Sequence, residues 1–245
     1  MRSLLPDPAE LDDAGLVEAY RVPAGRHLRV NFIASLDGAV TVDGRSGGLG
    51  SPGDRRIFQV LRALADVVLV GHGTASTEGY RPIAAESAVG RLRASIGRPS
   101  TAPIAVVSQR ASLDPGSGLV TGAVSPTVLV TCAAADAGRR GALADAGVTV
   151  LVCGDDEVDL PAALDRLAEL GHEQVLCEGG PTLFRDALTA GVVDEVDLSV
   201  APALVGQQHR LIEGLPDAVR LDLRQVLEED GTLFTRYALH EPSAN

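Results

Sequence analysis

Short apolar runs rich in valine recur along this chain, and helical patterns separate many of them. Such a run forms a strand buried on both faces, and helices between successive strands favour parallel pairing. We expect strands at 28–35, 67–74, 103–108, 127–131, 148–154, 174–180 and 195–205. We expect helices at 54–65, 86–96, 135–146, 161–170 and 181–190, several of them closed by glycine.

This alternation predicts an α/β protein of three layers, α/β/α, in which helices cover both faces of a mostly parallel sheet. An Asp-Gly pair at 230–231 separates two apolar segments, which indicates a hairpin and therefore an antiparallel C-terminal edge. The sequence contains no internal repeat and no linker long enough to divide it. We expect an N-terminal arm over 1–25, a single domain over 26–245 and a surface loop at 112–126.

The charge of the chain excludes several classes of protein. The net charge is −12, and lysine is absent, so arginine is the only permanently cationic side chain. Without lysine there is no Schiff-base lysine, no P-loop lysine and no Ser-Lys pair. The negative charge predicts no nucleic-acid partner and no membrane partner. An anionic ligand would have to be held by local arginines or by backbone N–H groups.

The cysteines and the absence of targeting patterns indicate the cellular compartment of the protein. Cys132, Cys153 and Cys177 each lie in or beside an apolar run, so we interpret them as buried side chains in a reducing environment. No C-x-x-C occurs and the five histidines are scattered, so we predict no metal site. No signal-peptide pattern or membrane-spanning stretch is visible, and we expect a cytoplasmic protein.

One junction between a strand and a helix could carry chemistry. In "QVLCEGGPTL" an apolar run ends at Glu178, and two glycines and Pro181 follow. Free N–H groups at a helix start, approached closely through glycine, suit a phosphate or pyrophosphate. Glu178 would then point into the crevice at the carboxyl end of the sheet. The alternative is a tight turn with a solvated glutamate, and the residues alone do not separate the two.

Two further glycine-rich segments follow strands. "VGHGTAST" (70–77) has serine where the Rossmann fingerprint needs its third glycine, which favours a plain turn. The segment 33–56 is long and glycine-rich between a strand and a helix, which favours a binding loop. Within it, Asp37 precedes a glycine as in a turn, and Ser51 or Asp54 could cap the next helix.

Taken in order, these stretches resemble a known family. "SLDG", a G-x-S with "SP" and "LRA", "VGxGT", "EGGPTL" and "VDE…AP.L.G" are similar to the reductase domain of the bacterial bifunctional riboflavin-biosynthesis deaminase/reductase. The resemblance covers about residues 28–240 and implies a dihydrofolate reductase-like fold. The zinc deaminase motifs are missing, so the resemblance implies a stand-alone reductase. It also implies a homodimer and a cis Gly179–Gly180 peptide.

In that family NADPH reduces the opened ribosyl group of a 5-amino-6-(5-phosphoribosylamino)uracil, with hydride going to C1′. Thr74 and Ser108, which match the cofactor site of the family, close neighbouring strands, and we expect them to bind the 2′-phosphate with charge from Arg110 or His72. The cofactor-binding residues that we predict are Ile33, Gly48, Gly71, Gly73, Thr74, Glu78, Ser108, Arg110, Gly179, Gly180, Pro181, Thr182 and Leu183.

The resemblance implies fewer residues for the substrate site than for the cofactor site. The substrate-binding residues that the resemblance implies are Ser46, Arg62, Tyr80, Arg81 and Glu178. The catalytic candidates are Glu178, Asp37 and Asn31. Asn31 stands where the family usually has lysine, and Gly48 stands where it often has an aromatic residue. A pterin or folate reductase on the same fold, or a binding protein without catalysis, therefore stays open as an alternative.

Overall fold

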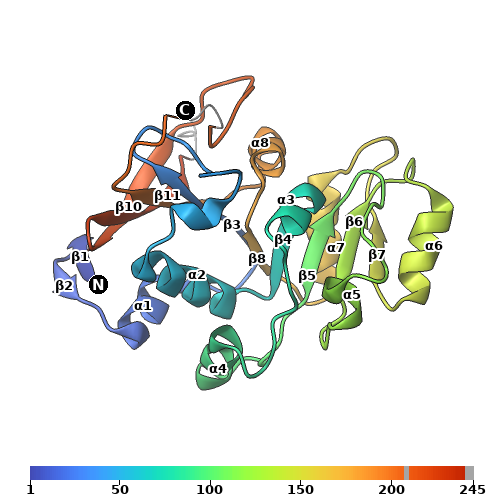
Figure 1. Cartoon of the computed structure of the whole chain (residues 1–245), viewed down its shortest axis with the longest axis horizontal. Helices are drawn as coiled ribbons and strands as arrows, with labels where there is room; N and C mark the ends of the chain where they lie inside the picture. Colours follow the sequence, from blue (N-terminus) through green and yellow to red (C-terminus); the bar gives the residue numbers. More distant parts are fainter. Residues whose placement is uncertain (207–209, 241–245) are drawn as a thin grey trace.

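The computed structural model describes residues 1–206 and 210–240 (Figure 1). The strands are β1 (Arg2–Leu5), β2 (Ala9–Glu10), β3 (His27–Ser35), β4 (Val67–Gly71), β5 (Ile104–Val107), β6 (Val128–Thr131), β7 (Thr149–Val152), β8 (Gln174–Cys177), β9 (Glu195–Ala201), β10 (Leu221–Glu229) and β11 (Thr232–Leu239). The helices are α1 (Asp13–Ala19), a 3-10 turn at Ser46–Gly48, α2 (Pro52–Leu64), α3 (His72–Thr77), α4 (Ala88–Ser95), α5 (Gly118–Thr121), α6 (Ala137–Asp145), α7 (Leu160–Glu169) and α8 (Pro181–Thr189).

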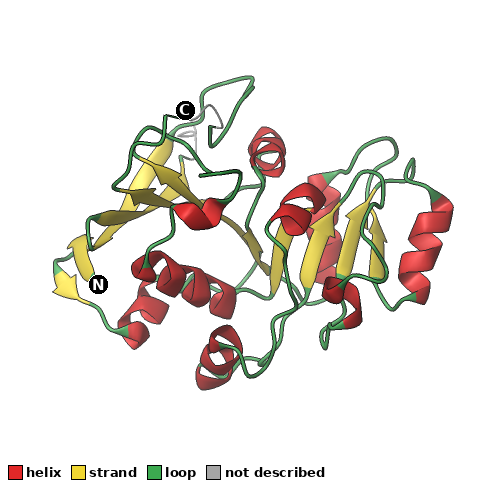
Figure 2. Cartoon of the chain, in the orientation of Figure 1, coloured by secondary structure: helices red, strands yellow, loops and turns green. Residues whose placement is uncertain are grey.

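These strands form one mixed sheet in the order β2-β1-β10-β11-β9-β3-β8-β4-β5-β6-β7. The strands from β9 to β7 pair in parallel, whereas β11, β10, β1 and β2 continue the sheet in antiparallel pairs. The predicted fold class, a mostly parallel sheet with an antiparallel edge, is confirmed (Figure 2). Asp230 and Gly231 both have positive φ, as the hairpin between β10 and β11 requires.

Helices cover the two faces of the sheet unequally. Apolar side chains of α1, α2, α4, α5 and α6 pack against one face, and those of α7 and α8 pack against the other. In α2 the buried positions Ile57, Val60 and Leu61 recur at helical spacing, so its opposite side is left for polar residues. The predicted three layers are therefore present. No helix in the described ranges is long and apolar enough to cross a membrane.

The N-terminal segment differs from the expected arm. β1 pairs with β10, and Leu16 and Val17 of α1 and Tyr20, which follows the helix, are buried in the core. The prolines and aspartates of this N-terminal segment lie in turns and in a helix cap. In the cap, the Asp12 side chain accepts the N–H of Gly15. The predicted boundary at residue 26 stays a prediction. Two smaller differences are that 112–126 contains α5 and that α3 replaces the plain turn expected after β4.

Candidate active site

A cleft of about 610 Å³ opens where the carboxyl ends of β3, β4 and β8 meet the starts of α2, α3 and α8. This is the edge of a parallel sheet at which α/β proteins bind ligands. The predicted site residues that line it are Asn31, Ile33, Ser46, Gly71, Gly73, Thr74, Glu78, Tyr80, Glu178, Gly180, Pro181, Thr182 and Leu183. Most of the predicted cofactor positions thus share one cavity with the predicted catalytic Glu178 and Asn31.

The predicted site residues outside this lining are Asp37, Gly48, Arg62, Arg81, Ser108, Arg110 and Gly179. Arg62 and Arg81 line an adjoining hollow of about 400 Å³, which shares Ser46, Glu78 and Tyr80 with the cleft. The two cavities are therefore neighbouring lobes of one region. The second lobe brings arginine side chains beside the apolar and glycine-rich first lobe.

The carboxylate of Glu178 is held by two side chains. Arg62 donates from Nε and Nη2 to its two oxygens, each at 2.7 Å, and the Tyr80 hydroxyl donates at 2.6 Å. Burial lowers the pKa of Arg62, but the ion pair with Glu178 outweighs burial and the pKa lies above its ordinary value. Burial, and then the charge of Glu178, raise the pKa of the Tyr80 hydroxyl. Both carboxylate oxygens are thus occupied, and Glu178 orients its neighbours.

One face of α2 points toward the site. Asp54, Phe58 and Arg62 follow one another at intervals of four residues, which places them on the same side of the helix. Phe58 lines both cavities, and the Arg62 guanidinium lies 4.2 Å from the centre of its ring. The four-residue spacing was visible in the sequence, but Phe58 was not among the predicted site residues.

The two glycines after β8 are required by their surroundings. The Gly179–Gly180 peptide is cis, which confirms the prediction. A Cβ on Gly179 would lie 2.4 Å from the ring of Phe32, and one on Gly180 would lie 2.5 Å from Oγ1 of Thr74. The Gly71 N–H donates to the Gly179 carbonyl at 2.7 Å and so ties the ends of β4 and β8 together. The start of α8 has no side-chain cap, which leaves its first N–H groups available to a ligand.

The polar side chains of the cleft differ in whether they have a hydrogen-bond partner in the protein. Within the described part of the chain, Oδ1 of Asn31 and Oγ1 of Thr41 are buried and have no hydrogen-bond partner. A buried polar atom without a partner is unfavourable, so both are suited to contact a polar ligand. Glu78 accepts the N–H of Ser46 at 2.9 Å and fastens the glycine-rich loop to the end of α3.

Asp37 and Ser108, two predicted site residues outside the lining of the cleft, accept hydrogen bonds from other groups of the protein. Asp37 accepts from the Ser35 hydroxyl and from the N–H groups of Val205 and Gly206. These bonds, led by that from Ser35, hold its pKa at about 2, so Asp37 is ionised at neutral pH and cannot supply a proton there. Oγ of Ser108 accepts the N–H of Ser112 at 2.9 Å, and this side chain is buried after β5.

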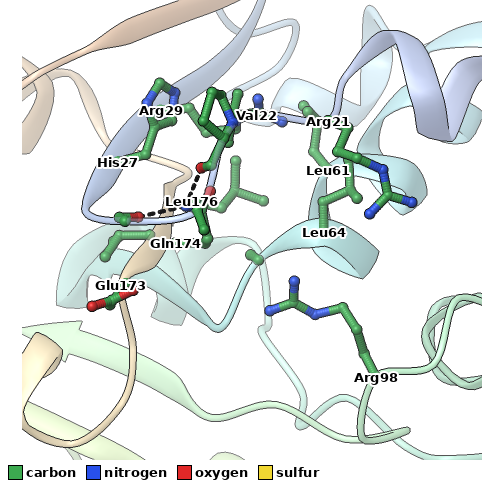
Figure 3. A pocket seen from close by; sticks show the side chains of 15 residues that line it. Arg21, Val22, His27, Arg29, Leu61, Leu64, Arg98, Glu173, Gln174 and Leu176 are labelled. Carbon is green, nitrogen blue, oxygen red and sulfur yellow. Dashed lines mark hydrogen bonds between the residues drawn. The ribbon is translucent and has the colours of Figure 1, made fainter.

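A second cavity of about 340 Å³ lies at the opposite, amino ends of β3 and β8 (Figure 3). Gln174 donates to the carbonyls of Pro23 and Gly25 there (Figure 3). Its arginines are already paired: Arg21 with Glu18, Arg98 with Asp66, and Arg29 with Glu195. The cleft at the carboxyl ends of the strands is the better candidate for the active site, because it holds most of the predicted site residues and the uncapped start of α8.

Residues 26–233 match the model of the RibD C-terminal domain family. The chain belongs to this family. A 2,5-diamino-6-ribosylamino-4(3H)-pyrimidinone 5′-phosphate reductase of Methanothermobacter thermautotrophicus is 30% identical over 87% of this chain and 98% of its own length. The family membership inferred from the five ordered motifs is thereby confirmed.

Two other proteins extend the comparison. Riboflavin biosynthesis protein RibD of Bacillus amyloliquefaciens is 28% identical over 74% of this chain, which spans only 46% of RibD. A crystal structure of a pyrimidine reductase-like protein from Corynebacterium diphtheriae superposes with a TM-score of 0.78 and 27% identity, covering 89% of this chain and 93% of that one. Relatives of this chain therefore occur both as single-domain proteins and within longer chains.

Proposed function

We propose that this protein is an NADPH-dependent reductase of a phosphoribosylaminopyrimidine in riboflavin biosynthesis. The observation that carries the proposal is the match over nearly the full length of a single-domain relative named as such a reductase, in a chain with a two-lobed cleft. The substrate is of the 5-amino-6-(5-phosphoribosylamino)uracil type or its 2-amino counterpart. Hydride is delivered to C1′ of the opened ribose.

The first lobe of the cleft fits a dinucleotide. The uncapped start of α8 offers backbone N–H groups to a pyrophosphate, and Gly180 leaves no side chain in its path. Thr74 lies beside Gly180, and Ile33 and Leu183 supply apolar wall. When bound, the nicotinamide supplies the hydride. Recognition of the 2′-phosphate by Thr74, Ser108 and Arg110 stays a prediction.

The second lobe fits a sugar phosphate. Arg81 is exposed at its rim, and Ser46 and Tyr80 line both lobes. A guanidinium fork suits phosphate, and the fork of Arg62 is already occupied by Glu178, so Arg81 is the better clamp. Glu178 and Arg62 form the rigid wall that orients the substrate. The amide of Asn31 and the hydroxyl of Thr41 contact its polar groups.

Two measurements test this function. Purified protein should oxidise NADPH in the presence of a phosphoribosylaminopyrimidine and should bind NADPH more tightly than NADH. The 2-amino and 2-oxo pyrimidines are compared to decide which form is preferred. Turnover of dihydrofolate with no turnover of either pyrimidine would instead favour the pterin reductase. NADPH binding without oxidation in either case would favour the non-catalytic binding protein.

The assembly and location are further parts of this proposal. We infer a homodimer that buries the face of β9, β11 and β10 opposite α1 and α2, because Leu221, Leu223 and Leu233 are exposed there. A cytoplasmic location is supported by the cysteines: Cys132, Cys153 and Cys177 are buried and unpaired, as a reducing compartment would keep them.

A further inference from the structure

Asp54 lines the cleft, and the proposed function gives its carboxyl group no role. It lies in the first turn of α2, whose N-cap is Ser51, and its own N–H donates to Oγ of Ser51 at 3.1 Å. Capping is therefore done by the serine, and the Asp54 side chain lines the cleft together with Asn31 and Glu178. Phe58, one turn later on the same helix face, lines both lobes, so Asp54 lies in the first lobe on the helix face that leads to the second.

The other acids of the cleft are already committed. Glu178 is bound by Arg62 and Tyr80, and Glu78 accepts the N–H of Ser46. Over residues 1–206 and 210–240, no arginine lies within ion-pair distance of the Asp54 carboxylate. Asp54 is thus the cleft acid that is free to exchange a proton with a ligand.

The surroundings of Asp54 favour its protonated form. Burial raises the pKa of Asp54, opposed by the Ser199 hydroxyl on β9 and by the charge of Arg55 on its own helix. Two other acids lie nearby: Glu178 at the end of β8, whose charge is paired with Arg62, and Asp197, two residues before Ser199 on β9. Asp54 therefore keeps its proton to higher pH than an exposed aspartate does.

The proposed reduction requires such a proton. In the cyclic substrate C1′ is saturated and cannot accept hydride. The C1′–O4′ bond must first break while the lone pair of the attached nitrogen forms a C1′=N bond, and O4′ takes up a proton. Hydride then adds to C1′ and returns the electron pair to nitrogen. The balance is one proton and one hydride consumed per ribityl group formed.

We propose that Asp54 is the catalytic acid that protonates O4′ and opens the ribose ring. This inference rests on the proposed function, since ring opening is a step of that reaction. Asp54 starts the cycle as a neutral carboxylic acid, becomes a carboxylate when O4′ departs, and regains its proton from solvent at the cleft. The partly exposed position of the side chain permits this exchange.

The test compares Asp54→Asn with Asp43→Asn, an exposed aspartate of the preceding loop that does not line the cleft. Loss of a general acid should lower kcat for the pyrimidine about 100-fold or more in Asp54→Asn, with Kd values for NADPH and substrate within about threefold of wild type. Asp43→Asn should match wild type. An active wild type with an equally active Asp54→Asn would overturn the proposal and leave the reductase function intact. A wild type without pyrimidine reduction would refute the function itself.

Two readouts separate an acid from a structural residue. With NADPH deuterated at the transferred position, the isotope effect on kcat should fall toward one in Asp54→Asn, because ring opening becomes rate-limiting. The descending alkaline limb of kcat/KM in wild type should disappear in the variant. Independently of turnover, a carboxyl infrared band that persists in wild type to higher pH than that of an exposed aspartate, and that is missing in Asp54→Asn, should report the neutral acid. An unchanged isotope effect and pH profile, or an Asp54 that ionises at the pH of an exposed aspartate, would overturn the assignment.

Discussion

At the scale of single residues, the ion pair between Glu178 and Arg62 is the most constrained feature of the site. Three hydrogen bonds of 2.6–2.7 Å fix one carboxylate, and the side chain of Glu178 is only 3% exposed. A buried charge is tolerated only when paired and hydrogen-bonded, so each donor supports the others. We therefore interpret Glu178 as a positioning group whose geometry depends on Tyr80 as well as on Arg62.

Removing one of these donors should be measurable in stability. Tyr80→Phe deletes a hydrogen bond to a buried carboxylate and should lower the free energy of unfolding by about 1.5–3 kcal/mol. The matched control is Tyr237→Phe, since Tyr237 is partly exposed on β11. Urea denaturation of the three proteins gives the comparison. Equal losses in the two variants would show that the bond to Glu178 contributes nothing particular.

A second residue-scale prediction concerns Asp197. Burial raises its pKa to about 8, and neither of its oxygens has a hydrogen-bond partner in the described part of the chain. Between its ordinary pKa of 3.8 and pH 8, the folded state keeps this proton and the unfolded state releases it. Stability should therefore fall as pH rises through this window, by at most about 1.4 kcal/mol per pH unit, and level off above it.

Asp197→Asn removes this proton from the balance. When the free energy of unfolding is measured in urea at pH 5, 6, 7 and 8, the value for the variant should rise relative to that of wild type as pH rises. Glu228→Gln is a suitable control, because the carboxyl of Glu228 lies at the surface and accepts the N–H of Gly231. Parallel curves for wild type and Asp197→Asn would contradict the raised pKa.

At the scale of elements, α2 connects the core to both lobes of the cleft. Its apolar side packs on the sheet, and its other side carries Asp54, Phe58 and Arg62. Its carboxyl end is closed by Arg93 of α4, which donates from Nη1 to the carbonyls of Arg62 at 3.0 Å and Ala65 at 2.5 Å. The last turn, and with it Arg62, is thereby held in place.

Arg93→Met should loosen this end of the helix. The variant leaves buried carbonyls without a donor, so a loss of about 3 kcal/mol or more in the free energy of unfolding is expected. Arg91→Met, an exposed change on the same helix, should have little effect. Hydrogen exchange should locate the change in the last turn of α2. If the last turn of α2 exchanges in Arg93→Met at the same rate as in wild type, Arg93 is not needed to close the helix.

At the scale of the whole molecule, helix cover is uneven across the sheet. In Figure 1, β10 and β11 lie at one end of the molecule and β6 and β7 at the other. Leu223 pairs with Tyr237, and Leu233 with Val200, which places these side chains on one sheet face. Leu223 is 44% and Leu233 is 38% exposed, so this face is suited to a second copy of the chain.

Leu223→Arg should separate the proposed dimer. Light scattering after size exclusion should give twice 25.3 kDa for wild type and 25.3 kDa for the variant, because a buried unpaired arginine at the interface is strongly unfavourable. Val124→Arg, on an exposed loop remote from this face, should remain dimeric. A dimer that persists in Leu223→Arg would exclude this face as the interface.

The sequence by itself determined the local features: the alternation of apolar runs and helices, the Asp-Gly hairpin, and the strand–Gly-Gly–helix junction after Glu178. These follow from residue periodicity and from the backbone freedom of glycine, which act over a few positions. Only the tertiary structure decided that Arg62 binds Glu178, 116 positions away, and that Asp37 turns to the backbone near Val205. It also decided that the first 20 residues join the sheet and core. Such contacts depend on which distant surfaces pack together, and periodicity carries no information about that.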